Sequence, residues 1–270
     1  MAIGYDGPPA WRRVVGLWRL VDTESSAAPP RDAPVVRRGT GVYNLTDPTG
    51  RQPGSGAWSQ FGQDHIVDKI LKKKRSGFFV EIGGFDGESH SNTLFFEKSR
   101  GWDGLLVEAN PHTYAQLVRK GRTCSSIRAC VSREVRTMDF KIGGGLTTAV
   151  DLTSRKHLQR IAGNTRLYGA QESWEGVGET VTTSCYTLNS MLEALGTDRV
   201  DYFSLDVEGA ELYVLQSIDW ARVVIDVLTI EIGQSRRGDI HAFMLSKGYR
   251  RVEPAPLEID DVYVRVASGL

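Results

Sequence analysis

Cysteine is scarce in this sequence, and neither sign of charge is in excess. The 270 residues contain three cysteines, Cys124, Cys130 and Cys185, an odd number without the spacing of a zinc site. Neither a disulfide framework nor structural zinc is therefore indicated, and a reducing, cytoplasmic compartment is the simpler expectation. The 33 basic and 33 acidic side chains cancel. Without a basic excess to neutralise phosphates, the composition argues against nucleic acid as a partner.

Long apolar runs are also missing. The most apolar segment near the start, 11–21, is interrupted by three arginines and falls far short of the ~20 apolar residues that a membrane helix needs. No uninterrupted apolar stretch of about 7–15 residues precedes a small-residue cleavage site, so a signal peptide is not indicated. The sequence predicts no transmembrane segment.

The sequence does have a large apolar content and abundant glycine. Apolar residues make up 40% of the chain, enough for a substantial core, and several of the 29 glycines cluster where strands would turn into helices. Residues 1–57 differ, because prolines punctuate a polar stretch without sustained periodicity. We predict a flexible arm over residues 1–57 and one domain over residues 58–270. Within the arm, one helical face would be apolar. It could dock on a partner or a membrane surface, or pack on the chain's own domain; its residues are Trp11, Val14, Val15, Trp18 and Val21.

From Ser59 onward, short apolar runs alternate with amphipathic stretches. The runs predict buried strands at 78–82, 105–107, 127–131, 200–205 and 223–230, with closing strands at 249–252 and 261–264. Helical patterns lie between them, at 92–98, 111–120, 188–195, 208–217 and 240–247. This alternation predicts an α/β fold with a doubly wound, mostly parallel sheet that helices cover on both faces. The polar, glycine-rich stretch 143–180 is predicted to be an insertion near the site.

A glycine-rich turn follows the first predicted strand, in Val80-Glu81-Ile82-Gly83-Gly84-Phe85-Asp86-Gly87. Glycines at a strand end let backbone approach a ligand closely, although such turns are often purely structural. The dinucleotide pattern G-x-G-x-x-G is absent, and Glu81 would repel a pyrophosphate. A cationic ligand suits this acid better, and S-adenosylmethionine carries both a sulfonium and an ammonium group. We therefore predict that Glu81, Gly83 and Gly87 belong to an S-adenosylmethionine site.

Further strand ends complete the predicted cofactor site. Glu108 lies about 25 residues after Gly83, near the ~20 expected of the acid that binds ribose hydroxyls. The alternative is that Glu108 is an acid at a helix N-terminus. The next strand end, which includes Ser132, is expected to border the adenine. Asn92 is expected to bind the methionine carboxylate, with capping of the following helix as the alternative.

Together with several other segments, these residues resemble the FkbM family of methyltransferases. The shared motifs include Ser59-Gln60-Phe61-Gly62-Gln63-Asp64, the glycine turn, Val107-Glu108-Ala109-Asn110-Pro111 and, most specifically, Asp206-Val207-Glu208-Gly209-Ala210-Glu211. The resemblance covers about Ser59 to Val264. It implies the class I, Rossmann-like methyltransferase fold, with seven strands and an antiparallel last strand. It also implies transfer from S-adenosylmethionine to hydroxyl groups of sugars or secondary metabolites. Some animal relatives carry a membrane anchor in the region of the arm, where this sequence shows none.

In that topology the strand ending at Glu81 neighbours the strand ending at Asp206, and ligands bind where the strand order reverses. Asp206, Glu208 and Glu231 are then expected to converge on one cavity and to take part in catalysis, with Asp206 also bordering the cofactor. Like charges so close need a cation, a shared proton or a partner. A magnesium ion bridging hydroxyl and carboxylates is one way to meet that need.

A hydroxyl acceptor needs its proton removed, and the candidate bases are ranked by their place in the fold. Asp206 is the first candidate and Glu231 the second, while His90 and His157 are weaker ones. For Glu208 and the neighbouring Glu211, the alternative is a structural role as acids at a helix N-terminus.

Two functions of different classes fit these residues. The first is an S-adenosylmethionine-dependent O-methyltransferase acting on a small-molecule or glycan acceptor. The second is a catalytically inactive binding or trafficking protein, because the resemblance extends to animal Star, which acts in secretory-pathway export. A nicotinamide dehydrogenase is disfavoured by Glu81 and the missing third glycine. Acceptor recognition is expected in the 143–180 stretch, where Arg166, Tyr168 and Trp174 are available for stacking, and Gln63 and Asp64 are expected at the edge of the cofactor pocket.

Overall fold

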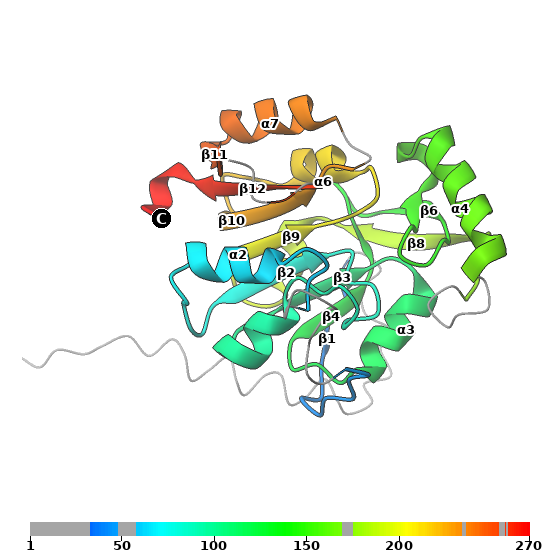
Figure 1. The fold of residues 1–270 in the computed structure, drawn as a ribbon, viewed down its shortest axis with the longest axis horizontal. Helices are drawn as coiled ribbons and strands as arrows, with labels where there is room; N and C mark the ends of the chain where they lie inside the picture. Colours follow the sequence, from blue (N-terminus) through cyan, green and yellow to red (C-terminus); the bar gives the residue numbers. More distant parts are fainter. Residues whose placement is uncertain (1–32, 48–57, 169–174, 234–235, 254–256, 258) are drawn as a thin grey trace, which may run out of the picture.

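The structure is a computed structural model that describes residues 33–47, 58–168, 175–233, 236–253, 257 and 259–270, with only the backbone described at 164–168. Its centre is an eight-stranded sheet (Figure 1). The strands lie in the order β1 (Arg37–Arg38), β4 (Ser125–Arg128), β3 (Asp103–Glu108), β2 (Phe78–Ile82), β9 (Arg199–Leu205), β10 (Val224–Glu231), β12 (Asp260–Arg265) and β11 (Tyr249–Arg251). The five strands from β4 to β10 are parallel to one another. β12 runs antiparallel to both of its neighbours, which confirms the expected antiparallel last strand.

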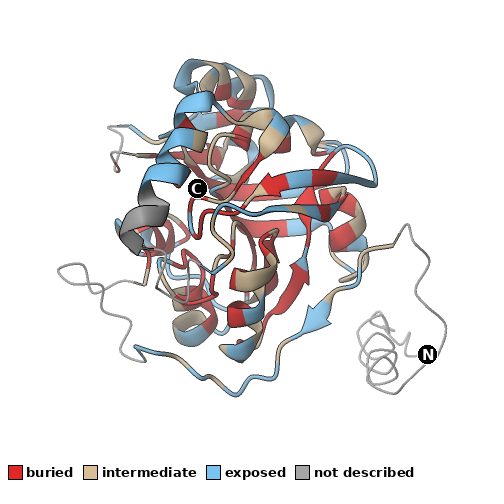
Figure 2. Ribbon diagram, turned by 90° about the vertical axis from the view of Figure 1, so that its right-hand side faces the viewer, coloured by how far each residue is buried: buried red, intermediate tan, exposed pale blue. Residues whose placement is uncertain are grey.

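Alternate side chains of the central strands pack toward opposite faces of the sheet, as the period of two requires. Val80 and Ile82 of β2 join a core on one face, while Phe79 joins a core on the other. The first face is covered by α5 (Leu188–Glu193), α6 (Glu211–Ser217) and α7 (Arg237–Ser246). The second is covered by α2 (Gln63–Ile70), the π-helical η2 (Phe96–Arg100) and α3 (Pro111–Arg119). Figure 2 shows the buried strands between these layers, and the predicted doubly wound α/β fold is confirmed.

Local signals fix several helix ends. Asn110 caps α3, because its side chain accepts a hydrogen bond from the His112 backbone N–H at 2.9 Å, and Pro111 occupies the first turn. The helix predicted from residue 208 begins only at Glu211. Glu208 and Gly209 both have positive φ, so the chain forms a tight loop there before it turns into α6.

A second sheet stands beside the first and is formed only in part by the predicted insertion at 143–180. Its strands are β5 (Cys130–Val131), β8 (Thr180–Tyr186), β6 (Arg136–Lys141) and β7 (Thr148–Ala149). The single strand predicted at 127–131 is divided at Ala129, so that β4 stays in the main sheet and β5 pairs with β8. The rest of the insertion carries the short 3₁₀ helix η3 (Val150–Leu152) and α4 (Arg155–Tyr168), whose outer face is exposed (Figure 2).

Cys130 and Cys185 form a disulfide, contrary to the expectation of no disulfide framework. Parallel pairing of β5 with β8 sets the two residues opposite each other, with 4.3 Å between their Cα atoms. The two cysteines are 55 residues apart in sequence, so spacing alone does not reveal the pair. Cys124 is buried and free. The argument for a reducing, cytoplasmic compartment therefore no longer holds.

Part of the predicted arm packs on the domain. β1 pairs antiparallel with the edge strand β4, the Tyr43 hydroxyl donates to Glu97 at 2.7 Å, and the backbone N–H groups of Thr46 and Asp47 donate to Glu88. For residues 33–47 the prediction of a flexible arm therefore does not hold, because the open edge of β4 offers backbone partners that composition does not reveal. The apolar helical face at 11–21 lies outside the described residues. Each helix in the described segments falls short of the length and apolarity needed to cross a bilayer.

Candidate active site

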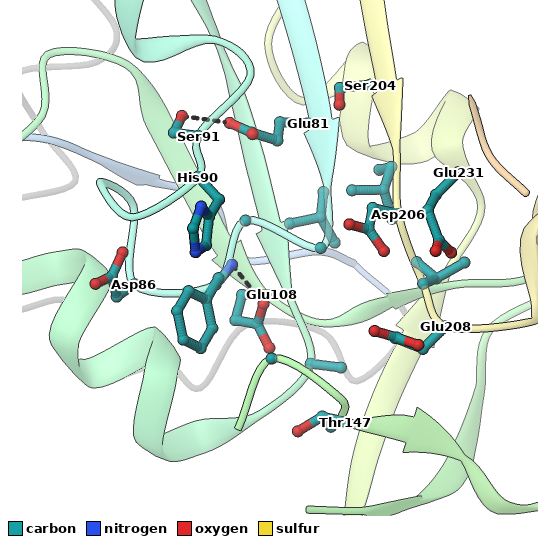
Figure 3. Close-up of a pocket in the computed structure, with 18 of the residues that line it drawn as sticks. Glu81, Asp86, His90, Ser91, Glu108, Thr147, Ser204, Asp206, Glu208 and Glu231 are labelled. Carbon is teal, nitrogen blue, oxygen red and sulfur yellow. Dashed lines mark hydrogen bonds between the residues drawn. The ribbon is translucent and has the colours of Figure 1, made fainter. Parts of the chain in front are cut away.

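A cavity of about 1090 Å³ opens at the carboxyl ends of β2, β3, β9 and β10 (Figure 3). It lies where the strand order reverses, since β2 is followed by β3 and β4 on one side and β9 by β10 on the other. This is the switch point at which α/β sheets bind ligands. The volume exceeds the range of roughly 300–1,000 Å³ typical of one small-molecule site, which leaves room for a cofactor and an acceptor together.

Gly83 joins the two central strand ends. Its φ is +87°, and a Cβ atom at this position would lie 1.9 Å from the backbone oxygen of Asp206. In the same contact, the Asp206 N–H donates to the Ile82 carbonyl at 3.1 Å. Only glycine allows the loop after β2 to approach the loop after β9 this closely. Gly83 also lines the cavity, as predicted for a residue of the cofactor turn.

Gly87 and Ser132 lie away from the cavity lining, unlike the prediction that they contact the cofactor. Gly87 has a φ of +80°, and a Cβ atom at this position would lie 3.0 Å from the Leu117 side chain. Its carbonyl oxygen accepts a hydrogen bond from Arg122. Ser132 is fully buried, and its hydroxyl donates to the Glu134 carbonyl at 2.5 Å. The chain leaves the cavity before Ser132 because β5 turns into the second sheet. Lining residues at this strand end are Ala129, Cys130 and Val131.

Glu81 uses its carboxylate to hold the loop beside it. One oxygen accepts from the Asn92 backbone N–H at 2.7 Å, and the other accepts from the hydroxyls of Ser91 at 3.0 Å and Thr93 at 2.5 Å. Figure 3 shows the carboxylate turned toward Ser91 and away from Asp206. Burial raises the pKa of Glu81, and the charge of Arg122 opposes that rise. Glu81 therefore has a structural role, but it also lines the cavity, and its predicted contact with a cationic ligand stays a prediction.

Asn92 presents an unpartnered acceptor. Its side-chain N–H donates to the Ser204 hydroxyl at 2.8 Å, whereas its Oδ1 is buried without a hydrogen-bond partner. The residue lines the cavity. An orphaned amide oxygen needs a donor, so Asn92 fits a ligand N–H better than the carboxylate that the sequence led us to expect.

Glu108 is buried at the end of β3 and lines the cavity as predicted. Its two oxygens accept from the backbone N–H groups of Phe85 at 2.7 Å and Asn110 at 2.8 Å. Burial raises the pKa of Glu108 to about 7, against the effect of these hydrogen bonds. Each carboxylate oxygen can accept a second hydrogen bond, so the group is still able to bind a hydroxyl. Thr147, from the 143–147 loop, closes this side by accepting from the Asn110 amide at 3.1 Å.

An apolar wall that sequence analysis missed faces these polar groups. The second sheet supplies it from β6 and β7, and η3 and α6 complete it; the residues are Met138, Phe140, Ala149, Leu152 and Tyr213. Met138 and Phe140 alternate with charged neighbours along β6, the period of two of a half-buried strand. That alternation is the signal from which this strand could have been predicted.

Asp206, Glu208 and Glu231 line the opposite side of the cavity, and the structure brings them together as predicted (Figure 3). Asp206 is exposed to the cavity. Burial and the nearby charges of Glu231 and Glu208 raise its pKa well above the ordinary range. Burial, with Glu208 and Glu211, raises the pKa of Glu231 to about 8, and its Oε2 has no hydrogen-bond partner. Glu231 is therefore poised near neutral pH, and the pKa of Asp206 lies above its ordinary range.

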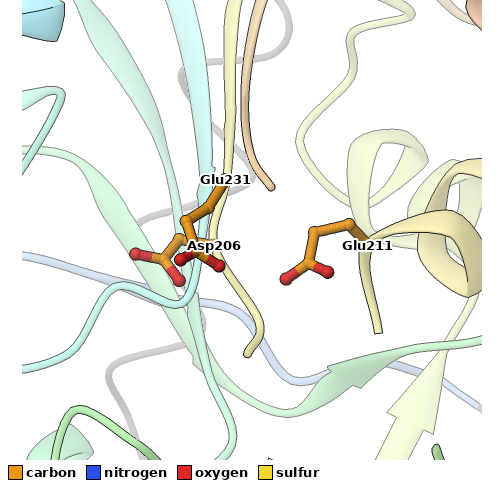
Figure 4. Close-up of side chains that lie close together, drawn as sticks. All are labelled: Asp206, Glu211 and Glu231. Carbon is orange, nitrogen blue, oxygen red and sulfur yellow. The ribbon is translucent and has the colours of Figure 1, made fainter. Parts of the chain in front are cut away.

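Glu211 lies beside Asp206 and Glu231 and has a different role (Figure 4). It is fully buried, and its Oε1 accepts from the backbone N–H groups of Val207 at 3.1 Å and Gly209 at 3.0 Å. It thus braces the loop that carries Asp206. Carboxylate oxygens of Asp206, Glu211 and Glu231 come within 4.8 Å of one another, and this acidic cluster is the whole support for magnesium. We assign no metal to it.

The remaining candidates divide between the cavity and the fold. His90 lines the cavity, and burial lowers its pKa. Gln63 donates to Asp260 and Asp64 accepts from the Ser59 hydroxyl, so both are structural, and Gln60 is the residue of this motif that reaches the cavity. The stacking candidates Arg166, Tyr168 and Trp174 have side chains outside the described residues.

Comparison with known proteins identifies the family. The profile of the Methyltransferase FkbM domain matches residues 81–251, more than half of the chain, so the chain belongs to this family. With its mostly parallel sheet and antiparallel last strand, the chain has the class I, Rossmann-like methyltransferase fold. A search of curated proteins finds no match.

Solved structures similar to this chain are distant from it. A methyltransferase FkbM from Methylobacillus flagellatus aligns with a TM-score of 0.42 and 11% identity, over 70% of this chain and 43% of its own length. The chain thus spans less than half of that protein. A TehB-like SAM-dependent methyltransferase from Corynebacterium glutamicum aligns with a TM-score of 0.38 and 10% identity, over 77% of this chain and 89% of its own.

The contact at Gly83 is testable by substitution. Gly83→Ala is expected to lower the free energy of unfolding by at least about 3 kcal/mol, because the new Cβ collides with the Asp206 carbonyl. Gly101→Ala is the matched control, since Gly101 has a φ of +68° but open space around it. It should cost about 1–2 kcal/mol, for left-handed backbone alone. Chemical denaturation measures both, and equal costs for the two variants would contradict this account of Gly83.

Proposed function

We propose that this chain transfers the methyl group of S-adenosylmethionine to a hydroxyl group of a small-molecule or glycan acceptor. The observation that carries the proposal is the meeting of two sets of groups in one cavity. On one side lie Glu108 and Asn92, which offer acceptors to a cofactor. On the other lie Asp206 and Glu231, carboxyl groups with raised pKa values, and among the described residues no neighbouring cation outweighs the effect of burial on them.

The described residues fit the cofactor's chemistry. The orphaned Oδ1 of Asn92 suits the ammonium of the methionine portion, and Glu108 suits the ribose hydroxyls. The wall of Met138, Phe140 and Tyr213 is apolar enough to take an adenine ring. S-adenosylmethionine supplies an activated methyl group at a sulfonium centre.

The chain's own task is to position the acceptor hydroxyl and to take up its proton. Methyl transfer is an in-line displacement, so holding the reacting atoms in place contributes much of the rate. Asp206 follows β9 where the loop after β2 meets it at Gly83, and Glu231 ends the neighbouring strand β10. A positive charge close by favours the ionised form of an acid, so a bound cation would convert these raised-pKa groups into bases. We assign the role of base to Asp206 and a supporting role to Glu231.

Asp206→Asn is expected to lower the turnover number by at least about 100-fold, because the amide cannot take up a proton. The dissociation constant for S-adenosylhomocysteine should stay within about three-fold, since only the proton acceptor is lost. Transfer is measured with methyl-tritiated S-adenosylmethionine and a panel of monosaccharides and methyl glycosides, and binding by calorimetry. Asp198→Asn is the matched control, because Asp198 is an exposed residue just before the opposite end of β9. In this variant the turnover number and the dissociation constant should both be unchanged.

Two outcomes would contradict the proposal. If the wild-type chain gives neither heat nor a thermal shift with millimolar S-adenosylmethionine, the cavity does not bind this cofactor. If Asp206→Asn turns over at the wild-type rate, Asp206 is not the base. Cofactor binding without transfer to any hydroxyl of the panel would favour the inactive, binding protein instead.

Cofactor affinity should depend on the ionisation of Glu108. The raised pKa means that Glu108 is largely protonated at pH 6 and ionised at pH 8, and only the ionised form offers all its lone pairs to ribose hydroxyls. Binding of S-adenosylhomocysteine should therefore be about ten-fold weaker at pH 6 than at pH 8. Glu108→Gln should bind weakly at both pH values and lose most of this dependence. A wild-type pH dependence that persists unchanged in Glu108→Gln would assign it to another group.

A further inference from the structure

Glu208 makes contact with the insertion through a histidine. His157 lies on α4 with a side chain only 1% exposed, and its Nε2 is 2.9 Å from the Leu146 carbonyl oxygen. Its Nδ1 faces the Oε2 of Glu208 at 3.6 Å. Both of these atoms are buried, and neither has a hydrogen-bond partner. Two orphaned polar atoms that face each other form a contact that a movement of about 0.8 Å would turn into a hydrogen bond.

The chemistry of the two atoms requires a proton between them. A carbonyl oxygen only accepts, so the ring nitrogen next to Leu146 must carry the hydrogen. A neutral ring then presents a lone pair at Nδ1, and an ionised Glu208 also presents lone pairs. Two buried acceptors face to face are unfavourable. One added proton turns the contact into an acid–imidazole or an imidazolium–carboxylate hydrogen bond.

The surroundings of the pair support a protonated Glu208. Burial raises the pKa of Glu208 to about 7 and lowers the pKa of His157, so both groups favour their neutral forms. Arg160 of the same helix faces the same Glu208 oxygen at 3.7 Å, but its side chain is 48% exposed, so water screens its charge. The charge of Arg160 lowers the pKa values of Glu208 and His157, and the charge of Glu211, in α6, raises both.

Glu208 is also held at its backbone. Its φ is +53°, a left-handed backbone conformation that residues other than glycine rarely adopt. Its carbonyl oxygen accepts a hydrogen bond from the Thr148 hydroxyl at 3.2 Å. The strained backbone of Glu208 directs its side chain into the cavity at a cost in conformational free energy. The position of the carboxyl group then depends on the group that it contacts.

We propose that His157 is a positioning residue: it shares one proton with Glu208 and so holds that side chain at the cavity wall beside Asp206. The consequence for turnover rests on the proposed methyl transfer, whereas the shared proton does not. Without the imidazole, Glu208 is free to ionise and to swing toward Arg160 and solvent, and the acceptor then loses one wall of its site.

Ring-nitrogen chemical shifts test the pair without any acceptor. The protein has five histidines, and with ¹⁵N-histidine labelling the signals of His157 are the ones that vanish in His157→Gln. In the wild type, Nδ1 should be hydrogen-bonded or protonated. In Glu208→Ala it should move to the value of a free lone pair, while Nε2 keeps its hydrogen. Identical Nδ1 shifts in the wild type and Glu208→Ala would overturn the proposal.

Two amide substitutions separate positioning from packing. Asparagine places an amide where Nδ1 lies and keeps the contact with Glu208, whereas glutamine places one where Nε2 lies and keeps only the contact with Leu146. On the panel acceptor that the wild type methylates fastest, His157→Gln should lower the turnover number about ten-fold, and His157→Asn less than about three-fold. The dissociation constant for S-adenosylhomocysteine should not change in either. In a Glu208→Ala background, His157→Gln should cost nothing further.

Equal losses in the two amide variants, or a further loss in the Glu208→Ala background, would show that His157 acts only through packing. If the wild type methylates no acceptor, the proposed function fails. The ring-nitrogen shifts still decide whether the pair shares a proton.

Discussion

Burial of carboxyl groups at one edge of a parallel sheet is the constraint on which this site depends. Taking a carboxylate out of water is costly unless hydrogen bonds or a cation replace the lost solvation. The chain meets this cost in two ways. Glu81, Glu108 and Glu211 accept hydrogen bonds from loop backbone or hydroxyl groups, and each shapes a loop at the cavity. Asp206, Glu208 and Glu231 have no such donors among the described residues, and their pKa values rise instead.

The two groups of acids therefore have different roles: those that accept hydrogen bonds are structural, and the others are available for chemistry. The braced carboxyl groups fix the loops after β2, β3 and β9, and so fix where the others point. The unbraced ones remain available to a ligand. Because the pKa values of Glu208 and Glu231 are raised from about 4.5 to about 7 and about 8, the ligand-free chain loses stability as pH rises through that range. Perturbed acids in a cleft are characteristic of functional sites.

The second sheet and the 143–180 insertion are both part of the site. The sheet provides most of the apolar wall, helix α4 of the insertion brings His157 to Glu208, and the glycine-rich loop of the insertion contacts Asn110 through Thr147. The Cys130–Cys185 disulfide ties β8, which follows the insertion, to the strand end at the cavity. The 143–180 stretch looks weakly patterned because its elements are short and lean on the rest of the domain for burial.

The fold and the strand-end residues could be predicted from sequence, because apolar runs mark buried strands and ligands gather where parallel strands end. Gly83, Glu108, Asp206 and Glu231 were found in this way. The roles of neighbouring side chains could not be predicted, since they depend on how each loop closes. Glu81 turns to the Ser91–Thr93 segment, Gly87 packs on Leu117, and Ser132 follows β5 out of the cavity. The disulfide depends on the register of β5 against β8, which no spacing rule encodes.

Proton release on cofactor binding is the most direct test of the central claim. That claim is that Asp206 and Glu231 are protonated in the ligand-free cavity and ionise when a positive charge binds beside them. Calorimetry with S-adenosylmethionine at pH 7, in buffers of different ionisation enthalpy, counts the protons exchanged on binding. The account predicts net release from the wild type, because the cation ionises Asp206 and Glu231, and little release from the Asp206→Asn, Glu231→Gln double variant. Binding without proton release in the wild type, or equal release in both proteins, would contradict it.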